Sequence, residues 1–429
     1  MTEQRPHQRP LDISTAWERP VVPERGGTAT LVIRVKAAPV QTGQRRAPVD
    51  VAFALDRSGS MQGPKLELVK QAVTTAVSLL RDDDRAALVI YDNEVESLQP
   101  LAPATSRMKA ALRLALHGVD AGGSTYLSGG WLAGCDELAG AMDPDDRTRV
   151  RRALLLTDGQ ANVGIVDPGE LANHAGELRR RGIGTTALGV GEDFDEMLLS
   201  GMSEAGGGNF QYVERPDQLP AFFQAEIGEL TTLVATGLAL SVTLPHGVRA
   251  RLVNAFPVER TGKRIDVAIG DVPAGNDLSL VFDLTVEPGR TGTEHPIAVA
   301  LAWTDPAADA TRRLDLPVSP LTLVTQAEYN RAVPDPTVQE ESAVEHANAT
   351  QREAMRLDRA GRHAESRAHL RQSVAVLSAA PQSARVAHFA MEMNTLADAD
   401  TDTAFDTTVH KQVTYDAMRR SRGRQDDPR

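Results

Sequence analysis

The stretch from residue 49 to residue 60, "VDVAFALDRSGS", decides the fold because it joins an unbroken apolar run to an acid and two serines. Three further runs are nearly as apolar: "RAALVIYD" (85–92), "RRALLLTD" (151–158) and "TTALGVG" (185–191). Such runs are typical of parallel strands buried on both faces. Amphipathic segments at helical spacing separate them. The alternation predicts an α/β domain over residues 48–232, with a doubly wound, mainly parallel sheet.

The pattern changes after this domain to period-two segments separated by Pro and Gly. Examples are "RIDVAIGDVPAG" (264–275) and "LSLVFDLTVEPG" (278–289). This pattern predicts an antiparallel β-sandwich domain over residues 233–325. Residues 1–47 form an N-terminal arm that contains one strand-like segment, "TATLVIRVKAAP" (28–39). We expect that segment to join the sandwich, which would make the α/β domain an insertion.

The chain becomes polar and helical from 326 to 420, beginning around the Pro-rich break "VPDPT" (333–337). Two amphipathic helices are expected to pair as a hairpin with a turn at residues 360–362. A further helix is expected at about 383–397, and the tail 421–429 is expected to be disordered.

Bulk properties limit the function classes. The formal net charge of −12 argues against a general nucleic-acid binder. The start of the chain has no apolar leader, and no apolar stretch is long enough to span a bilayer, so no membrane insertion is expected. The single cysteine, Cys135, falls on a predicted core face and cannot form an internal disulfide. A cytoplasmic location is the expectation.

Asp56, Ser58 and Ser60 follow the first apolar run at two-residue spacing. Mg²⁺ prefers oxygen ligands, and acid and hydroxyl side chains at alternate positions of a tight loop can direct several oxygens to one point. An alternative is that Ser60 caps the following helix while Gly59 relieves the turn.

Two other loops carry oxygen ligands. "DAGGSTYLSGG" (120–130) offers Thr125 before a helix, and Asp158 ends the third apolar run. Ligand sites of open parallel sheets lie outside the carboxyl ends of the strands, where Asp56 and Asp158 would both emerge. We therefore expect three oxygen-bearing loops to converge.

These residues resemble a known family. Asp56, Ser58, Ser60, then Thr125 in "GGST" and Asp158 in "LLLTDG" look like the complete metal-ion-dependent adhesion site of von Willebrand factor A domains. The resemblance covers residues 48–232. It implies Mg²⁺ as the cofactor, with Mn²⁺ or Ca²⁺ as other candidates.

The resemblance also implies roles. Ser58 and Ser60 would coordinate the metal through their hydroxyls, Thr125 directly or through a water, and Asp56 and Asp158 would mostly hold metal-bound waters. A first shell without carboxylates leaves the ion attractive to an anion. In the family, a Glu or Asp of a partner protein completes the shell.

Several neighbours could shape the site. Met61, Gln62, Tyr126 and Asn162 are candidates for its rim, where they would either touch a partner or only cover the metal. Asp92 follows a predicted strand and is expected to lie in a solvated turn. The three arginines at 179–181 end a predicted helix, where the helix dipole favours basic side chains.

The leading functional hypothesis is a Mg²⁺-dependent protein-interaction module without enzymatic activity, which binds an acidic residue of a partner. An alternative is an adaptor subunit of an AAA-type ATPase or chelatase-like machine. A metal-dependent hydrolase is a third reading, but Ser58 or Ser60 as nucleophile would need a base, and the three converging loops supply none.

Overall fold

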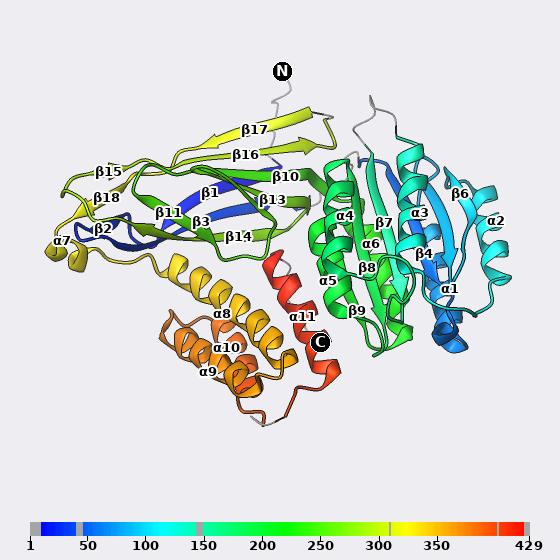
Figure 1. The fold of residues 1–429 in the computed structure, drawn as a ribbon. Helices are drawn as coiled ribbons and strands as arrows, with labels where there is room; N and C mark the ends of the chain where they lie inside the picture. The colour runs from blue at the N-terminus through cyan, green and yellow to red at the C-terminus, as the bar shows by residue number, and fades with distance from the viewer. Residues whose placement is uncertain (1–9, 40–45, 143–148, 309, 401–402, 424–429) are drawn as a thin grey trace, which may run out of the picture.

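A computed structural model describes residues 10–39, 46–142, 149–308, 310–400 and 403–423. Figure 1 shows three parts: an α/β domain, a β-sandwich beside it, and a group of C-terminal helices below the sandwich. No helix in these described ranges has the length and apolar character that crossing a membrane would require.

The α/β domain is built on a six-stranded sheet in the order β6-β5-β4-β7-β8-β9. Its strands are β4 (Val49–Asp56), β5 (Arg85–Tyr91), β6 (Val95–Pro103), β7 (Val150–Thr157), β8 (Ile183–Val190) and β9 (Gly207–Val213). The edge strand β6 runs antiparallel to β5, and the other neighbours are parallel. The predicted mainly parallel sheet is confirmed.

Helices cover this sheet on both faces. They are α1 (Pro64–Ser78), α2 (Ser106–His117), α3 (Leu127–Gly140), α4 (Pro168–Arg180), α5 (Glu196–Gly206) and α6 (Leu219–Leu230). The central strand β4 is buried along its whole length. Its Phe53 and Leu55 enter one core with α1 and α6, whereas Ala52 and Ala54 face Trp131 of α3 in the other. This double burial explains why the strand reads as a continuous apolar run.

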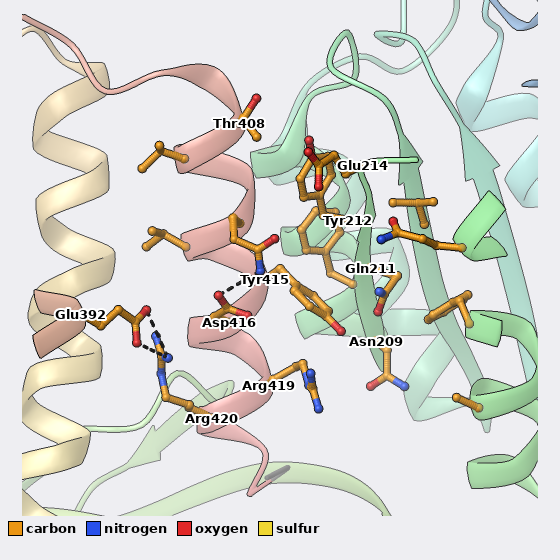
Figure 2. Close-up of a pocket in the computed structure, with 18 of the residues that line it drawn as sticks. Asn209, Gln211, Tyr212, Glu214, Glu392, Thr408, Tyr415, Asp416, Arg419 and Arg420 are labelled. Carbon is orange, nitrogen blue, oxygen red and sulfur yellow. Dashed lines mark hydrogen bonds and ion pairs between the residues drawn. The ribbon is translucent and has the colours of Figure 1, made fainter. Parts of the chain in front are cut away.

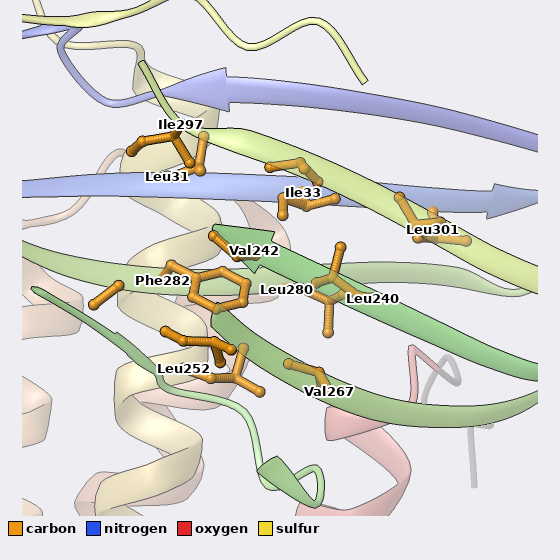
Figure 3. Close-up of a cluster of buried hydrophobic side chains, with 14 of the residues drawn as sticks. Leu31, Ile33, Leu240, Val242, Leu252, Val267, Leu280, Phe282, Ile297 and Leu301 are labelled. Carbon is orange, nitrogen blue, oxygen red and sulfur yellow. The ribbon is translucent and has the colours of Figure 1, made fainter. Parts of the chain in front are cut away.

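The β-sandwich contains three sheets, ordered β1-β3-β14-β11, β12-β13-β10-β16-β17 and β15-β18-β2. The later strands are β10 (Leu233–Thr243), β11 (Val248–Leu252), β12 (Val258–Thr261), β13 (Arg264–Pro273), β14 (Asp277–Val286), β15 (Glu294–His295), β16 (Ala298–Asp305), β17 (Ala310–Leu316) and β18 (Leu321–Val324). Alternate residues of the two larger sheets meet in one core, where Ile33, Leu240 and Phe282 lie together (Figure 3).

The N-terminal arm contributes three strands to the sandwich, β1 (Leu11–Trp17), β2 (Val21–Pro23) and β3 (Gly27–Ala37). The arm therefore holds two strands beyond the one expected. β3 pairs with β14 across ten residues, so strands on either side of the α/β domain in sequence are neighbours in one sheet. The parts of the arm at 1–9 and 40–45 lie outside the described residues.

Five helices follow the sandwich: α7 (Gln326–Arg331), α8 (Pro336–Arg359), α9 (His363–Ala379), α10 (Ala384–Ala397) and α11 (Thr407–Ser421). The predicted hairpin is present as α8 and α9. α11 lies within the predicted helical region but was not expected as a separate helix, and the expected disorder from residue 421 is wrong at its first position. Ser421 ends α11 and is buried, and its hydroxyl accepts hydrogen bonds from Asn348 and Arg352. Residues 424–429 lie outside the described part of the chain.

A buried carboxyl group lies in the packing of these helices. Glu345 of α8 is 4% exposed, and its Oε2 has no hydrogen-bond partner among the described residues. Burial raises the pKa of Glu345 from 4.5 to about 7, although nearby arginines, Arg352 foremost, act in the opposite direction. The charged form of Glu345 is therefore the unfavourable one in the folded chain.

Replacing Glu345 by Gln should flatten part of the pH dependence of stability. The folded state keeps its proton to a higher pH than the unfolded state, so the free energy of unfolding of the wild type falls as pH rises from about 4.5 to about 7. The Glu345→Gln variant lacks this loss and should gain about 1–3 kcal/mol relative to wild type between pH 5 and pH 8. Urea unfolding at both pH values measures it, and parallel pH profiles for the two proteins would contradict it.

Candidate metal site

The two predicted carboxylates lie at the same edge of the α/β sheet. Asp56 ends β4 and Asp158 follows β7, and the parallel register of these strands pairs Leu55 with Leu156. Both side chains are fully buried. The sheet topology therefore brings together two acids that are about a hundred residues apart in sequence, as the rule for ligand sites of open sheets requires.

The chain itself occupies both oxygens of the Asp56 carboxylate. Ser58 N donates to Oδ1 at 2.8 Å, and Thr157 Oγ1 donates to Oδ2 at 2.5 Å. Burial nevertheless raises the pKa of Asp56 to about 6, with the charge of Asp158 adding to the rise. These two hydrogen bonds fix the orientation of the Asp56 carboxylate, and both of its oxygens already accept from the chain.

The hydroxyl groups of the first loop lie beside Asp158. Ser58 Oγ and Ser60 Oγ are 3.2 Å apart, and Ser60 Oγ donates to Asp158 Oδ1 at 2.6 Å. The alternative role of Ser60 as a helix cap is wrong. α1 begins at Pro64 after Gly63, and no side chain caps it.

Thr125 comes from the second loop, which is tied to both others. Its N–H donates to Asn162 Oδ1 at 2.9 Å, and Asn162 N donates back to the Thr125 carbonyl. Gly159 leaves the space between the loops open, since a Cβ there would lie 3.4 Å from Ser60 Oγ and 3.5 Å from Thr125 Oγ1. Hydrogen bonds therefore join Ser58, Ser60 and Asp158, and Thr125 Oγ1 and Ser60 Oγ both lie close to Gly159.

Two neighbouring residues behave differently from expectation. Asp92 is only 9% exposed, so the predicted solvated turn is wrong. Its carboxylate lies 3.2 Å from Arg57 Nε, and its carbonyl accepts a hydrogen bond from Tyr126 N. Asp92 therefore links Arg57 of the first loop to Tyr126 of the second. Met61 is fully buried in the core beneath the site and cannot contribute to a rim. Gln62 and Asn162 are exposed, and Tyr126 is half-buried.

Lys65 is the member of the cluster that sequence reasoning missed. Its Nζ donates to Asp158 Oδ2 at 2.6 Å, and its side chain is 31% exposed. An ammonium group therefore balances the buried carboxylate. A Lys nine residues after Asp56, one residue into α1, was the available signal, although only the folded chain shows that it reaches Asp158.

The donor set fits a hard divalent cation. Three hydroxyl oxygens and two carboxylates converge from three loops, and all are oxygen ligands. The described residues contain no group of three or more His, Cys, Asp or Glu side chains that could hold a metal. A site here would therefore depend on the hydroxyls of Ser58, Ser60 and Thr125, with the two acids in support.

A larger cavity, of 1330 Å³, lies away from these loops, between the edge strand β9 and helix α6 on one side and α10 and α11 on the other. Figure 2 shows Tyr415 and Arg419 of α11 opposite Asn209 and Gln211 of β9. None of the five predicted site residues lines it. The candidate site is thus not part of this cavity.

Comparison with known proteins identifies the domain. Residues 50–225 match the model of the von Willebrand factor type A domain. These residues therefore form a domain of this class, whose members are generally protein-interaction modules and often bind a divalent metal.

Similarity also extends beyond this domain. The uncharacterized protein sll0103 of Synechocystis is 26% identical over 71% of this chain and 72% of its own length. YfbK of Escherichia coli is 27% identical over 66% of this chain, which spans about half (49%) of that relative. A von Willebrand factor type A structure from Catenulispora acidiphila has a TM-score of 0.71 at 20% identity and covers 96% of this chain and 98% of its own. The last likeness shows that the complete fold occurs elsewhere.

Replacing Lys65 by Met should make the protein depend on Mg²⁺ for part of its stability. The variant leaves the buried Asp158 without its ammonium partner, which should cost about 1–2 kcal/mol once the partial exposure of Lys65 is considered. Millimolar Mg²⁺ should then raise the melting temperature more in the variant than in the wild type.

The matched control is Lys36→Met, because Lys36 pairs with Asp277 on the exposed surface at 3.2 Å. It should change stability by less than about 1 kcal/mol and should not alter the response to Mg²⁺. Thermal unfolding with Mg²⁺ and with chelator measures both variants. Equal Mg²⁺ responses in Lys65→Met and wild type would show that Lys65 does not share its position with a cation.

Proposed function

We propose that the α/β domain binds a partner protein through Mg²⁺ held by Ser58, Ser60 and Thr125, with Asp56 and Asp158 behind them. The bound cation would supply a positive charge and an open coordination position for a Glu or Asp of the partner. The resemblance to the metal-ion-dependent adhesion site motivates the proposal. The hydrogen bonds that join Ser58, Ser60 and Asp158, and the position of Thr125 Oγ1 beside Gly159, support it.

The single observation that carries the proposal is the way the carboxylates are held. Asp56 is fixed by Ser58 N and Thr157 Oγ1, and Asp158 by Ser60 Oγ and Lys65 Nζ. Acids fixed in this way can attract a cation without closing its coordination shell, whereas neutral hydroxyls contact it. The arrangement favours an anionic group from outside the chain, even though the chain carries a net charge of −12.

The geometry gives no comparable support to hydrolysis. A serine nucleophile needs a base within hydrogen-bond reach. The Asp158 carboxylate lies within reach of Ser60 Oγ, but its ion pair with Lys65 favours the charged carboxylate and so opposes transfer of the serine proton to it.

Asp158→Ala should abolish Mg²⁺-dependent partner binding. Removing this carboxylate takes away an acceptor for Ser60 and half of the negative charge behind the hydroxyls, so affinity for the cation should fall at least about a hundredfold. The measurement is Mg²⁺ titration by calorimetry, followed by capture of partners from native lysate with Mg²⁺ and with chelator.

The matched control for that variant is Asp193→Ala, which removes an exposed carboxylate from the loop after β8 at the same edge of the sheet. It should bind Mg²⁺ and partner as wild type does. Circular dichroism checks that Asp158→Ala remains folded. Partner binding that persists in excess chelator, or that both variants lose equally, would contradict the proposal.

Mg²⁺ affinity should decrease in acid. Because burial raises the pKa of Asp56 to about 6, the group gains a proton as pH falls through that value, and the negative charge behind the hydroxyls is reduced. The dissociation constant for Mg²⁺ should be nearly constant above about pH 7 and rise up to about tenfold per pH unit below 6. Calorimetric titration between pH 5 and 8 measures it, and a constant affinity across that range would show that Asp56 carries no charge relevant to binding.

A further inference from the structure

A cleft of 530 Å³ separates the α/β domain from the β-sandwich at the edge of the sheet opposite to the metal site. On one side it is lined by the beginnings of β7, β8 and β9 and the end of α4. On the other side it is lined by parts of β10, β13, β16 and β17. The cleft therefore lies at the amino ends of the parallel strands, whereas Asp56 and Asp158 lie at the carboxyl ends.

The described lining of this cleft is strongly basic. It contains five arginines, Arg149, Arg151, Arg179, Arg180 and Arg181, but only one acid, Asp271. Several of these charges are balanced within the chain. Arg149 and Arg151 lie beside Asp50, and Arg180 pairs with Glu177 on the surface.

Arg179 and Arg181 are different. Among the described residues, neither side chain takes part in a hydrogen bond or ion pair. Arg179 is half-buried and lies flat on the backbone, since a Cβ at Gly207 would be 2.7 Å from its Nε and a Cβ at Gly270 would be 2.9 Å from its Nη2. Burial lowers the pKa of Arg179, with Asp271 opposing and Arg152 adding to that effect.

Asp271 cannot neutralise this group alone. Its Oδ2 accepts from Arg152 Nη2 at 2.8 Å, and its Oδ1 accepts from Gly237 N at 3.1 Å. Arg152 is itself buried behind the glycine backbone, and its Nε and Nη1 have no hydrogen-bond partner. The single negative charge of Asp271 is thus shared between the guanidinium groups of Arg152 and Arg179.

A second observation points to an acceptor that the described chain does not provide. Trp303 lines the cleft, is 9% exposed, and its buried indole N–H has no hydrogen-bond partner. The buried atoms of Arg152 and Trp303 that lack a hydrogen-bond partner are all donors. A buried donor without a partner is costly, and an unpaired set of donors matches a ligand that only accepts hydrogen bonds.

We propose that this cleft binds a phosphate-class oxyanion held by the guanidinium groups of Arg179 and Arg181. Planar guanidinium groups match the oxygens of phosphate, and two of them favour an anion with more than one charge over a single carboxylate. The ligand would touch Arg179 of the α/β domain while lying against Trp303 of the sandwich, so binding stabilises the contact between the two domains. The cleft volume accommodates inorganic phosphate or pyrophosphate.

Calorimetric titration of the full chain with inorganic phosphate and with pyrophosphate tests the proposal, at constant ionic strength and with chelator present so that divalent ions do not contribute. The wild type should bind with a saturable heat, and pyrophosphate more tightly than phosphate. Arg179→Ala and Arg181→Ala should each weaken binding at least about tenfold, the loss expected for one charge-assisted hydrogen bond. Acetate, with one charge, should not compete.

Arg180→Ala is the matched control, because Arg180 belongs to the same run but already pairs with Glu177. It should change the dissociation constant by less than about twofold. Arg179→Lys keeps the charge but loses the planar pair of donors, so it should bind with intermediate affinity if the fold is intact. Absence of saturable binding by the wild type, equal affinity in Arg179→Ala and wild type, or an equal loss in Arg180→Ala would each overturn the proposal.

Discussion

The burial of two carboxylates at neighbouring strand ends is the constraint on which the site depends. Asp56 and Asp158 are fully buried and repel each other, so they persist only because each is hydrogen-bonded. Thr157, Ser58 and Ser60 supply neutral donors, and Lys65 supplies the positive charge. The parallel register of β4 and β7 fixes the distance between the two strand ends. Hydrogen bonds from Ser58, Ser60 and Lys65 then position the first loop and the start of α1 against the two carboxylates.

The other two parts of the chain brace this domain. The strands of the sandwich stop at β3 and resume with β10, so the α/β domain is anchored at both of its ends. The C-terminal helices contact the same edge as the metal site, since Lys411 of α11 donates to the Glu192 carbonyl and Arg359 of α8 pairs with Glu196. A Cβ at Gly191 would lie 3.7 Å from Lys65 Nζ, which places this loop next to the cluster.

Elements could be predicted from the sequence where burial is uniform along a strand or where the spacing of residues in a loop is regular. Strands such as β4 and β7 are apolar on both faces, and Asp56, Ser58 and Ser60 lie within one loop, so both could be predicted. The roles of Lys65 and Asp92 could not be predicted in the same way, because they depend on contacts with residues of other loops: Asp158 for Lys65, and Arg57 and Tyr126 for Asp92. α11 was not predicted as a separate helix because its buried face includes His410, Lys411 and Arg420, and such a face lacks an apolar stripe.

The most direct test of this account is the location of a divalent ion in crystals grown with Mn²⁺, found by anomalous scattering. The account predicts a peak among Ser58 Oγ, Ser60 Oγ and Thr125 Oγ1, with Asp56 and Asp158 behind these oxygens and at least one coordination position filled from outside the chain. A peak elsewhere, no peak at these oxygens, or a shell closed entirely by groups of this chain would contradict it.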